Sequence, residues 1–390
     1  DIVKEIERNL DILTTSQQDL PQRHRSMRAV LDHFWQLLTQ EEQTVFQKQA
    51  VFRGGFTREA YEEVTGANLA MLSQFLDKSA IHFNEDGRYR RPSLMAQYAR
   101  VRLQENSTLY TKTRECHARY FSKFVKRLEG EFFGGQPQKA MAPFLADLAN
   151  IRFAWEWAVE HHNAEIFNDM ADTFMQAFDF AGLYRDAYDL AQQATASLLL
   201  LADPITEDVT LAKGRVMGLA GAFLFRLGEY KQALDWCQQS MQTLEEVRPH
   251  IAYAHSFVYA GAAEFGLGDM ENVVTYWQKA AKEYQAANSE WGFMTANSNL
   301  AEVFNALGRY EEGKSSAEHA LTLARKMHNL ESIGSASTSL AFLALQDGKY
   351  SEATQFAEEA LRSHQQVGHD AHIANSLAVL AQIASKQNNP

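Results

Sequence analysis

A turn motif that recurs at a fixed spacing is the feature that most constrains the fold of this chain. Glycines stand 40 residues apart in the second half, and in most copies a leucine precedes the glycine and a tyrosine follows two places later. A fixed period between about 20 and 50 residues is typical of repeat architectures, in which each unit packs mainly on its neighbours. The spacing therefore predicts a stack of similar units. The four turn glycines are Gly228, Gly268, Gly308 and Gly348.

Small side chains recur at two further positions of each unit. A glycine or alanine stands seven residues before the turn glycine, and a serine or alanine stands twelve residues after it. Small residues on two helices let the helices approach closely, and the turn glycine ends the first helix because it adopts positive φ at little steric cost. Each unit is therefore predicted to be an antiparallel pair of helices of about 18 residues. The small residues are Gly221, Gly261, Ala301 and Ala341 on the first helices and Ser240, Ala280, Ala320 and Ala360 on the second.

The composition argues against several classes of protein. The net charge is −12, and its excess lies beyond residue 110: residues 1–110 hold 14 Lys and Arg against 15 Asp and Glu, whereas the remainder holds 23 against 34. An acidic array of repeats is opposite in sign to a nucleic-acid-binding surface. No run of about 18 apolar residues and no signal-peptide pattern is found, so no membrane contact is expected. Cys116 and Cys237 are far apart in the sequence, which predicts reduced thiols and a cytoplasmic location.

Residues 21–105 have a different pattern, in which short helices are followed by a hairpin. Thr39 begins a capping box that starts one helix, and Thr57 and Asn68 are candidate caps for two more. The segments AIHFN and RYRR flank the turn Asp86-Gly87, and they are predicted to form two short strands. Helices followed by a small β-hairpin are typical of a winged-helix domain.

Several stretches outside the repeats carry a family resemblance. They are LPQRHRSMRAVLDHFWQLL, EEQTVFQKQAVFRGGFTREAYEEVTG, LSQFLDKSAI, LMAQYARVRL and LANIRFAWEWA. The first four resemble the winged-helix segment of bacterial STAND proteins, the signal-transduction ATPases with numerous domains, and the fifth resembles their connecting arm. The 40-residue units resemble tetratricopeptide repeats, whose usual length is about 34 residues.

The resemblance implies an all-α fold in four parts. Residues 1–20 resemble the tail of an upstream helical lobe, and residues 21–105 form the winged-helix domain with its small hairpin. Residues 106–205 form a helical arm with degenerate repeats, and residues 206–390 form an α-α superhelix of tetratricopeptide-like repeats. In the family, a nucleotide-binding module of the NB-ARC type precedes these parts.

The same resemblance implies a function in bacterial signal transduction. The repeats are expected to bind an inducer, which is a protein or a peptide, and the winged helix is expected to couple that event to the upstream module by an intramolecular contact. The alternative is a repeat scaffold or transcriptional regulator whose winged helix contacts DNA. The helix Leu69–Lys78 that would read the bases has a single basic residue, so DNA is the less favoured partner. The arginines available for phosphates are Arg23, Arg25, Arg28, Arg88, Arg90 and Arg91.

Two departures from the family pattern concern the nucleotide. No G-x-x-x-x-G-K-[ST] loop occurs, and the glycines within residues 134–139 have the wrong spacing for one. We therefore expect neither enzyme activity nor a cofactor in this span, with ATP or ADP and magnesium bound only by the upstream module. The family often has a histidine after the wing that reaches bound ADP, where this chain has Pro92 between Arg91 and Ser93. Arg90 or Arg91 can replace that contact electrostatically, or both are solvated wing arginines.

The inner face of the predicted superhelix is the candidate ligand-binding surface. In tetratricopeptide repeats the ligand-facing positions lie 13, 10, 6 and 3 residues before the turn glycine. In this chain those positions combine acidic, aromatic and amide side chains, which suit a protein or peptide better than a phosphate. The selected residues are Asp169, Asp172, Gln176 and Asp179 from a looser copy that ends at Gly182, and Arg215, Phe225, His255, Phe265, Glu302 and Asn305 from the regular units.

The last part of the chain carries two further expectations. His364, His369 and His372 lack a second paired set of ligands, so no metal site is predicted. Residues 370–386 are predicted to form the first helix of another unit and to cover the preceding pair. Its apolar residues Ile373, Leu377, Leu380 and Ile383 are predicted to face inward, because they lie at helical spacing.

Overall fold

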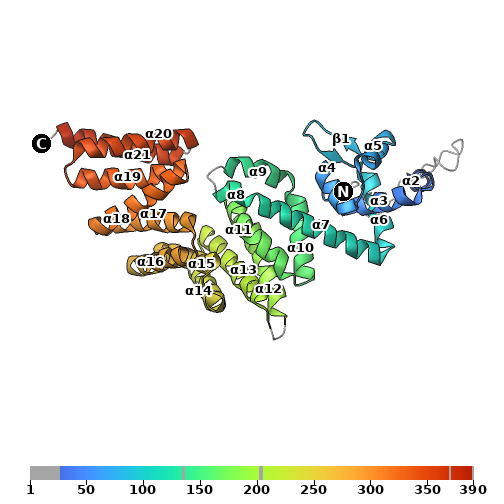
Figure 1. Cartoon of the computed structure of the whole chain (residues 1–390), viewed down its shortest axis with the longest axis horizontal. Helices are drawn as coiled ribbons and strands as arrows, with labels where there is room; N and C mark the ends of the chain where they lie inside the picture. The colour runs from blue at the N-terminus through green and yellow to red at the C-terminus, as the bar shows by residue number, and fades with distance from the viewer. Residues whose placement is uncertain (1–26, 134–136, 202–204, 369, 389–390) are drawn as a thin grey trace. The chain divides into compact units, whose positions relative to one another are not determined.

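The computed structural model describes residues 27–133, 137–201, 205–368 and 370–388, and this part of the chain is almost entirely helical (Figure 1). Within it, strands occur only as one short hairpin. The predicted fold class, all-α with a small hairpin followed by a superhelix of tetratricopeptide-like repeats, is confirmed. The predicted lobe tail in residues 1–20, Arg23, Arg25, His369 and residues 134–136 of the glycine-rich stretch lie outside the described residues.

The described chain divides into two compact units. The first contains residues up to Val125 together with Ala142–His161, and the second contains Lys126–Met141 and the chain from His162 onward. The first unit is thus larger than the predicted winged-helix range 21–105, because two helices from the predicted arm pack with it. The rest of the arm packs with the repeats.

In the first unit, helices precede and follow the hairpin in the order that the sequence predicts for a winged helix. The two strands are antiparallel, with His82 opposite Arg90. Most of α7 belongs to this unit. The elements are α2 (Met27–Gln36), α3 (Gln40–Lys48), the 3-10 turn η3 (Gln49–Val51), α4 (Arg58–Thr65), α5 (Leu69–Asp77), β1 (His82–Phe83), β2 (Tyr89–Arg90), α6 (Ser93–Gln104), α7 (Ser107–Arg127) and α10 (Leu148–Glu160).

The predicted caps in the first unit are confirmed. Thr39 and Glu42 form a reciprocal capping box at the start of α3, where each side chain accepts a hydrogen bond from the other residue's backbone N–H. Thr57 caps α4 and Asn68 caps α5. The helices bury an aromatic core that contains Phe46, Phe52, Phe56, Tyr61 and Phe75.

The second unit is built from helix pairs that follow one another in chain order, as Figure 1 shows from α13 to α20. Helix α8 (Glu129–Phe133) belongs to this unit, and α9 (Pro137–Ala146) spans the boundary between the two units. A short 3-10 turn, η4 (Glu245–Val247), follows α14, and a single helix, α21 (Asp370–Asn388), follows the last pair. The pairs are α11 (Ala164–Phe180) with α12 (Tyr184–Leu199), α13 (Glu207–Arg226) with α14 (Tyr230–Leu244), α15 (Ile251–Leu267) with α16 (Met270–Ala286), α17 (Glu290–Ala306) with α18 (Tyr310–Lys326) and α19 (Leu330–Gln346) with α20 (Tyr350–Val367).

Residues with positive φ mark the turns of the array. The four predicted turn glycines have φ values of 82°, 89°, 74° and 73° in chain order, which confirms their role at the end of each first helix. At the turns between units, Asn288 and His328 adopt φ of 54° and 53° without a glycine. Asparagine and histidine are among the residues that tolerate this region best, so these turns carry little strain.

A buried position sixteen residues after each turn glycine decides how the helices fit. Large side chains stand here in three units, and glycines receive them. A Cβ on Gly214 would lie 2.2 Å from Leu244, and a Cβ on Gly292 would lie 2.1 Å from the Tyr284 ring. Glycine is therefore required at these positions to leave space for a side chain of the facing helix, and not to form a turn.

In the fourth and third units, too, a large side chain on one helix faces a small residue on the other. A Cβ on Gly334 would lie 2.2 Å from His364 Nε2, so this histidine also needs its glycine. In the third unit the central residue is Ala324, and the first-helix position that holds Gly334 in the next unit holds Met294. Both residues are fully buried. In this unit the large side chain is on the first helix and the small one on the second, and the interior is still filled.

The predicted small residues seven places before the turn glycines have a related role. A Cβ on Gly221 would lie 2.5 Å from Cys237 Sγ, and one on Gly261 would lie 2.5 Å from the Trp277 ring. In these two units the glycine accommodates a partner side chain. The prediction that small residues here serve close backbone approach is therefore incomplete.

The last described helix, α21, packs on α19 and α20, as predicted. Its buried residues are Ser376, Val379 and Ile383. Leu377 is half exposed, so the prediction that it faces inward is wrong. The neighbouring Ser376 is buried instead, and its hydroxyl is 2.9 Å from His364 Nδ1.

Candidate functional site

The first helices of the pairs line the inner side of the array. Successive first helices contact one another, whereas contacts between successive second helices are sparser. Each of the ten residues predicted to bind a ligand lies on one of these first helices, namely α11, α13, α15 or α17. Gln176, on α11, is half buried. The ligand-binding role of all ten stays a prediction, but their contacts distinguish them.

Three of the predicted residues bind one another. Arg215 donates to the carboxylate of Asp172 and to the carbonyl oxygen of Asn168. His255 Nδ1 lies 3.9 Å from the other carboxylate oxygen of Asp172. Burial lowers the pKa of His255 to about 4 and outweighs the raising effect of Asp172. This group is therefore a neutral histidine beside a buried ion pair, and its polar atoms already serve the fold.

A short segment of the chain itself covers the first part of the inner face. Lys126 Nζ lies 2.5 Å from Asp169 Oδ1, and α8 contacts α11. Burial raises the pKa of Glu129 in this helix. At its end, Phe133 meets Trp291 of α17 edge to face, with ring centroids 4.7 Å apart. Sequence reasoning missed this arrangement, because no local pattern in α8 identifies its distant partner.

The next predicted residues lie near the turns. Asp179 is paired with Arg226 at 2.7 Å. Phe225 is partly buried, and its ring centroid is 6.0 Å from that of Tyr230. Phe265 is 51% exposed, which leaves it available for contact with a partner.

An open pocket of about 360 Å³ lies at the C-terminal part of the inner face. Residues of three first helices, α17, α19 and α21, form most of its wall, and one residue of α20 completes it. Two predicted ligand residues, Glu302 and Asn305, are part of this wall. The wall includes Glu302, Asn305, Ser335, Thr338, Phe342 and His364.

The pocket wall contains several polar side chains, and neighbouring helices support two of them. Desolvation raises the pKa of Glu302, although the residue is at the surface. The amide of Asn305 rests against α18, where Oδ1 would be 2.4 Å from a Cβ on Gly313. His364 is buried and in contact with Ser376. The wall thus presents hydroxyl, amide and carboxylate groups from helices that pack against one another.

Grouped metal ligands and reactive thiols would be further signs of a functional site in the described part of the chain. Among these residues no three His, Cys, Asp or Glu side chains are grouped to hold a metal ion. Cys116 is exposed and Cys237 is buried, and both are free thiols. Burial raises the pKa of Cys237 to about 12, so this thiol is inert as a nucleophile.

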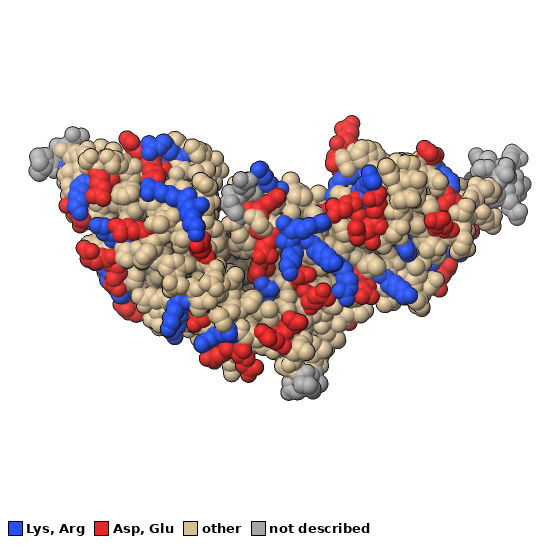
Figure 2. Space-filling model, in the orientation of Figure 1, with Lys and Arg blue, Asp and Glu red and all other residues tan. Residues whose placement is uncertain are grey.

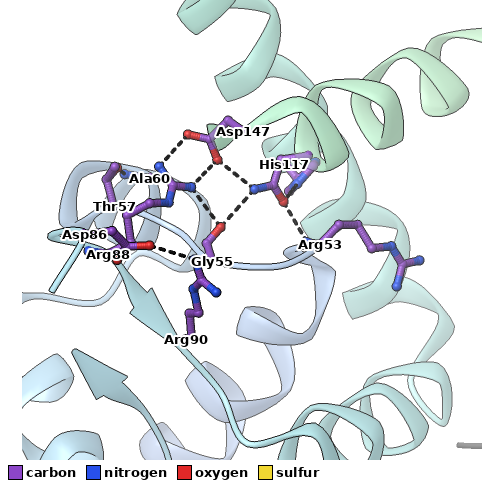
Figure 3. Close-up of polar contacts among 10 residues, drawn as sticks. Arg53, Gly55, Thr57, Ala60, Asp86, Arg88, Arg90, His117 and Asp147 are labelled. Atoms are coloured by element: carbon purple, nitrogen blue, oxygen red, sulfur yellow. Dashed lines mark hydrogen bonds and ion pairs between the residues drawn. The ribbon is translucent and has the colours of Figure 1, made fainter. Parts of the chain in front are cut away.

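A buried polar network ties the hairpin of the first unit to α10 and α7 (Figure 3). Arg88 Nη1 donates to Asp147 at 2.9 Å, and Nη2 donates to the carbonyl oxygen of Gly55 at 3.0 Å. Asn150 donates to the same carbonyl and to Asp147, at 3.0 and 2.8 Å. His117 Nε2 lies 3.3 Å from Asn150 Oδ1. The side chains of Arg88 and Asp147 are nearly inaccessible and neutralise each other, while His117 Nδ1 is buried without a hydrogen-bond partner in the part of the chain that the structure describes.

These contacts weaken the DNA alternative. Arg88 was a candidate phosphate contact in the wing, and this prediction is wrong because its guanidinium is buried against Asp147. Lys78, the basic residue of the candidate reading helix, is paired with Glu42. Arg90 is exposed and paired with Asp86 at 2.6 Å.

Arg91 differs from its neighbour Arg90. Its Nη2 donates to the carbonyl oxygen of Phe52 at 2.8 Å, while Nε and Nη1 are buried without a hydrogen-bond partner among the described residues. Burial lowers the pKa of Arg91 to about 9, and the nearby Arg100 and Arg53 lower it further. In Figure 3 the Arg53 side chain points away from the network around Asn150. The solvated alternative therefore fits Arg90 and does not fit Arg91.

The surface charge is mixed. On the face in Figure 2, acidic and basic residues are interspersed along the chain, without a broad basic area. No helix in the described ranges is long and apolar enough to cross a membrane.

Comparisons with known proteins agree with the repeats. The tetratricopeptide repeat family matches residues 292–366. Among solved structures, the chain is similar to a signal transduction ATPase with numerous domains (STAND) with a tetratricopeptide repeat sensor from Pyrococcus horikoshii, at 13% identity and a TM-score of 0.52. The match covers 96% of this chain and 57% of that protein, so the chain spans little more than half of its length.

Another similar structure is aspartyl phosphate phosphatase F from Bacillus subtilis, at 12% identity and a TM-score of 0.46, covering 92% of this chain and 87% of that one. No curated protein sequence matches the chain. At these identities the likeness concerns the fold.

Proposed function

We propose that this chain is the sensor and regulatory portion of a bacterial, cytoplasmic STAND-type ATPase, and that its inner face binds a protein or peptide inducer. The observation that carries the proposal is the open pocket of the inner face, which presents Glu302 and Asn305 on a rigid frame of first helices. Pockets of this kind, concave and with a few convergent polar groups, are the usual form of a binding site. In this proposal Asp172, Arg215 and His255, which bind one another, stabilise the fold and do not contact the inducer.

In this proposal the first unit transmits the binding event to a nucleotide-binding module upstream, which would hold ATP or ADP and magnesium. The buried network of Arg88, Asp147 and Asn150 supports this role, because it links the hairpin to α10, and His117 links α10 to α7. Of the two arginines at the end of the wing, Arg90 is exposed and suits a contact with a nucleotide or with the module, whereas Arg91 is held inside the unit by its hydrogen bond to Phe52.

A capture experiment tests the inner face. The 390-residue chain is immobilised as wild type and as Thr338→Arg, which places a long charged side chain in the pocket wall. Thr322→Arg, at an exposed position of the second helix α18, is the matched control. The wild type and the control should retain the same protein or peptide, and the amount retained by Thr338→Arg should be at least tenfold lower. Retention by Thr338→Arg together with loss by Thr322→Arg would place the binding surface on the outer side.

A further inference from the structure

The acidic side chains of the inner face follow a pairing rule. Asp169 is paired with Lys126, and Asp172 with Arg215. Asp179, near the turn of the same helix, is paired with Arg226. Each of these carboxylates therefore has a basic side chain of the chain itself as its counter-ion.

Glu302 breaks this rule. It has no ion pair with any residue in the described ranges. No lysine or arginine is present in the wall of its pocket. Glu302 is exposed to solvent at the pocket wall, and the protein around it still raises the pKa of its carboxyl. A carboxylate in such a wall without a counter-ion is favourably paired with a cation placed beside it.

The rest of the wall suits a cation on an apolar stem. Phe342 is half buried, and Tyr310 supports its ring at a centroid distance of 6.4 Å. An aromatic face attracts an ammonium or guanidinium group and also packs against methylene groups. Thr338 donates its hydroxyl hydrogen to the carbonyl oxygen of Gly334, so the lone pairs of that hydroxyl are available to accept. These groups make the pocket rich in acceptors.

The size of the pocket limits what it holds. Its volume of about 360 Å³ lies at the lower end of the range for small-molecule sites. A pocket of this size takes one long side chain and a short piece of backbone, not a folded partner. The partner therefore reaches the rest of the inner face with other residues.

We propose that this pocket binds a lysine or arginine side chain of the partner, with Glu302 as its counter-ion and Phe342 against its stem. The inference rests on the proposed function, because it makes the cation part of the protein or peptide inducer. The contact of Lys126 with Asp169 is an example of the same recognition within the chain. A partner segment with a basic residue would thus continue along the inner face the pairing that the chain begins.

Two probes of equal shape test the charge. The full chain is titrated with N-acetyl-arginine amide and with N-acetyl-citrulline amide, which replaces the guanidinium by a neutral urea, and binding is followed by ligand-observed NMR. The arginine probe should bind about tenfold more tightly, which corresponds to about 1.4 kcal/mol. Equal binding of the two probes would overturn the inference.

Three variants locate the effect. Glu302→Gln should reduce arginine binding about tenfold and abolish the preference over citrulline, and Glu302→Lys should turn the preference toward N-acetyl-glutamate amide. Glu331→Gln changes an exposed carboxylate at the start of α19 that is not part of the pocket wall, and it should leave the preference unchanged. If Glu302→Gln keeps the preference, the cation binds elsewhere and the inference is wrong.

The outcome can be separated from that of the capture experiment. If the pocket prefers arginine but Thr338→Arg does not affect capture of the partner, the cation subsite stands and the proposed inducer site fails. If Thr338→Arg abolishes capture while arginine and citrulline bind equally, the inner face stands and the cationic specificity is wrong.

Discussion

His117 shows how one side chain can make the first unit sensitive to acid. The ring is fully buried and lies against Asn150, and burial lowers its pKa to about 3. Nearby Arg114 and Arg53 also disfavour its charged form. In the unfolded chain the pKa is near 6.5. Between pH 6.5 and 3 the unfolded state therefore binds a proton that the folded state does not bind, and stability falls as the pH falls.

Replacement of this histidine should reduce that sensitivity. The wild type should lose about 2 kcal/mol of stability through His117 between pH 7 and pH 5, and His117→Gln should not show this part of the loss. The stability of the first unit is measured at both pH values from hydrogen exchange of the buried amides of α10. His33→Gln, at an exposed histidine of α2, is the control and should behave as the wild type does. An equal loss in His117→Gln and wild type would contradict the prediction.

At the scale of elements, the position sixteen residues after the turn glycine connects three helices. Tyr284 is received by Gly292 of the next unit, and His364 by Gly334 of its own unit and by the ring of His372, whose centroid is 5.0 Å away. The interior is close-packed, so an added methyl group has no space unless the central side chain becomes smaller. Helix pairs are therefore matched by volume.

A double-mutant cycle measures this match. Gly334→Ala should destabilise the array by about 1–3 kcal/mol, because the new methyl group overlaps the His364 ring, although alanine is the better helix former. In a His364→Ala background the same change should be neutral or stabilising by up to about 1 kcal/mol, which gives a coupling energy above 1 kcal/mol. Gly130→Ala is the control, since a Cβ there meets nothing within 4 Å. Additive effects in urea denaturation would contradict the match.

The elements also separate what the sequence predicts from what it does not. Turn glycines and the caps Thr39, Thr57 and Asn68 depend on interactions within a few residues, and they are predictable for that reason. The pair of Arg88 and Asp147 joins residues 59 positions apart, and no local pattern indicates it. For the inner face, the repeat register predicts which helices carry the residues. It does not predict that Arg215 turns to Asp172 or that α8 covers Asp169, because these depend on tertiary packing.

At the scale of the whole molecule, two units with separate cores should respond separately to damage. Phe75 is fully buried in the first unit and Leu300 is buried in the second. Phe75→Ala and Leu300→Ala each remove enough buried volume to cost about 2–5 kcal/mol. In a repeat array most of this loss stays near its origin, because each unit contacts mainly its neighbours.

Hydrogen exchange with mass spectrometry gives the test. Phe75→Ala should accelerate exchange in α3 to α6 and leave α15 to α18 at the wild-type rate, and Leu300→Ala should do the reverse. Acceleration of both regions by either substitution would mean that the chain unfolds as one cooperative body and that the division into two units has no energetic counterpart.

The volume match between helix pairs limits how such a chain can change its length in evolution. Unequal recombination removes one period at a time, and it preserves the turn glycines wherever the cut is made. Loss of residues 285–324 would bring Ser332 to the place of Gly292, where any Cβ collides with Tyr284. Loss of residues 245–284 would instead bring Gly292 beside Leu244 in place of Ala252, which leaves a gap. A deletion of one period is therefore expected to be tolerated only where the two new neighbours still match in volume, so the order of the units is constrained as well as their number.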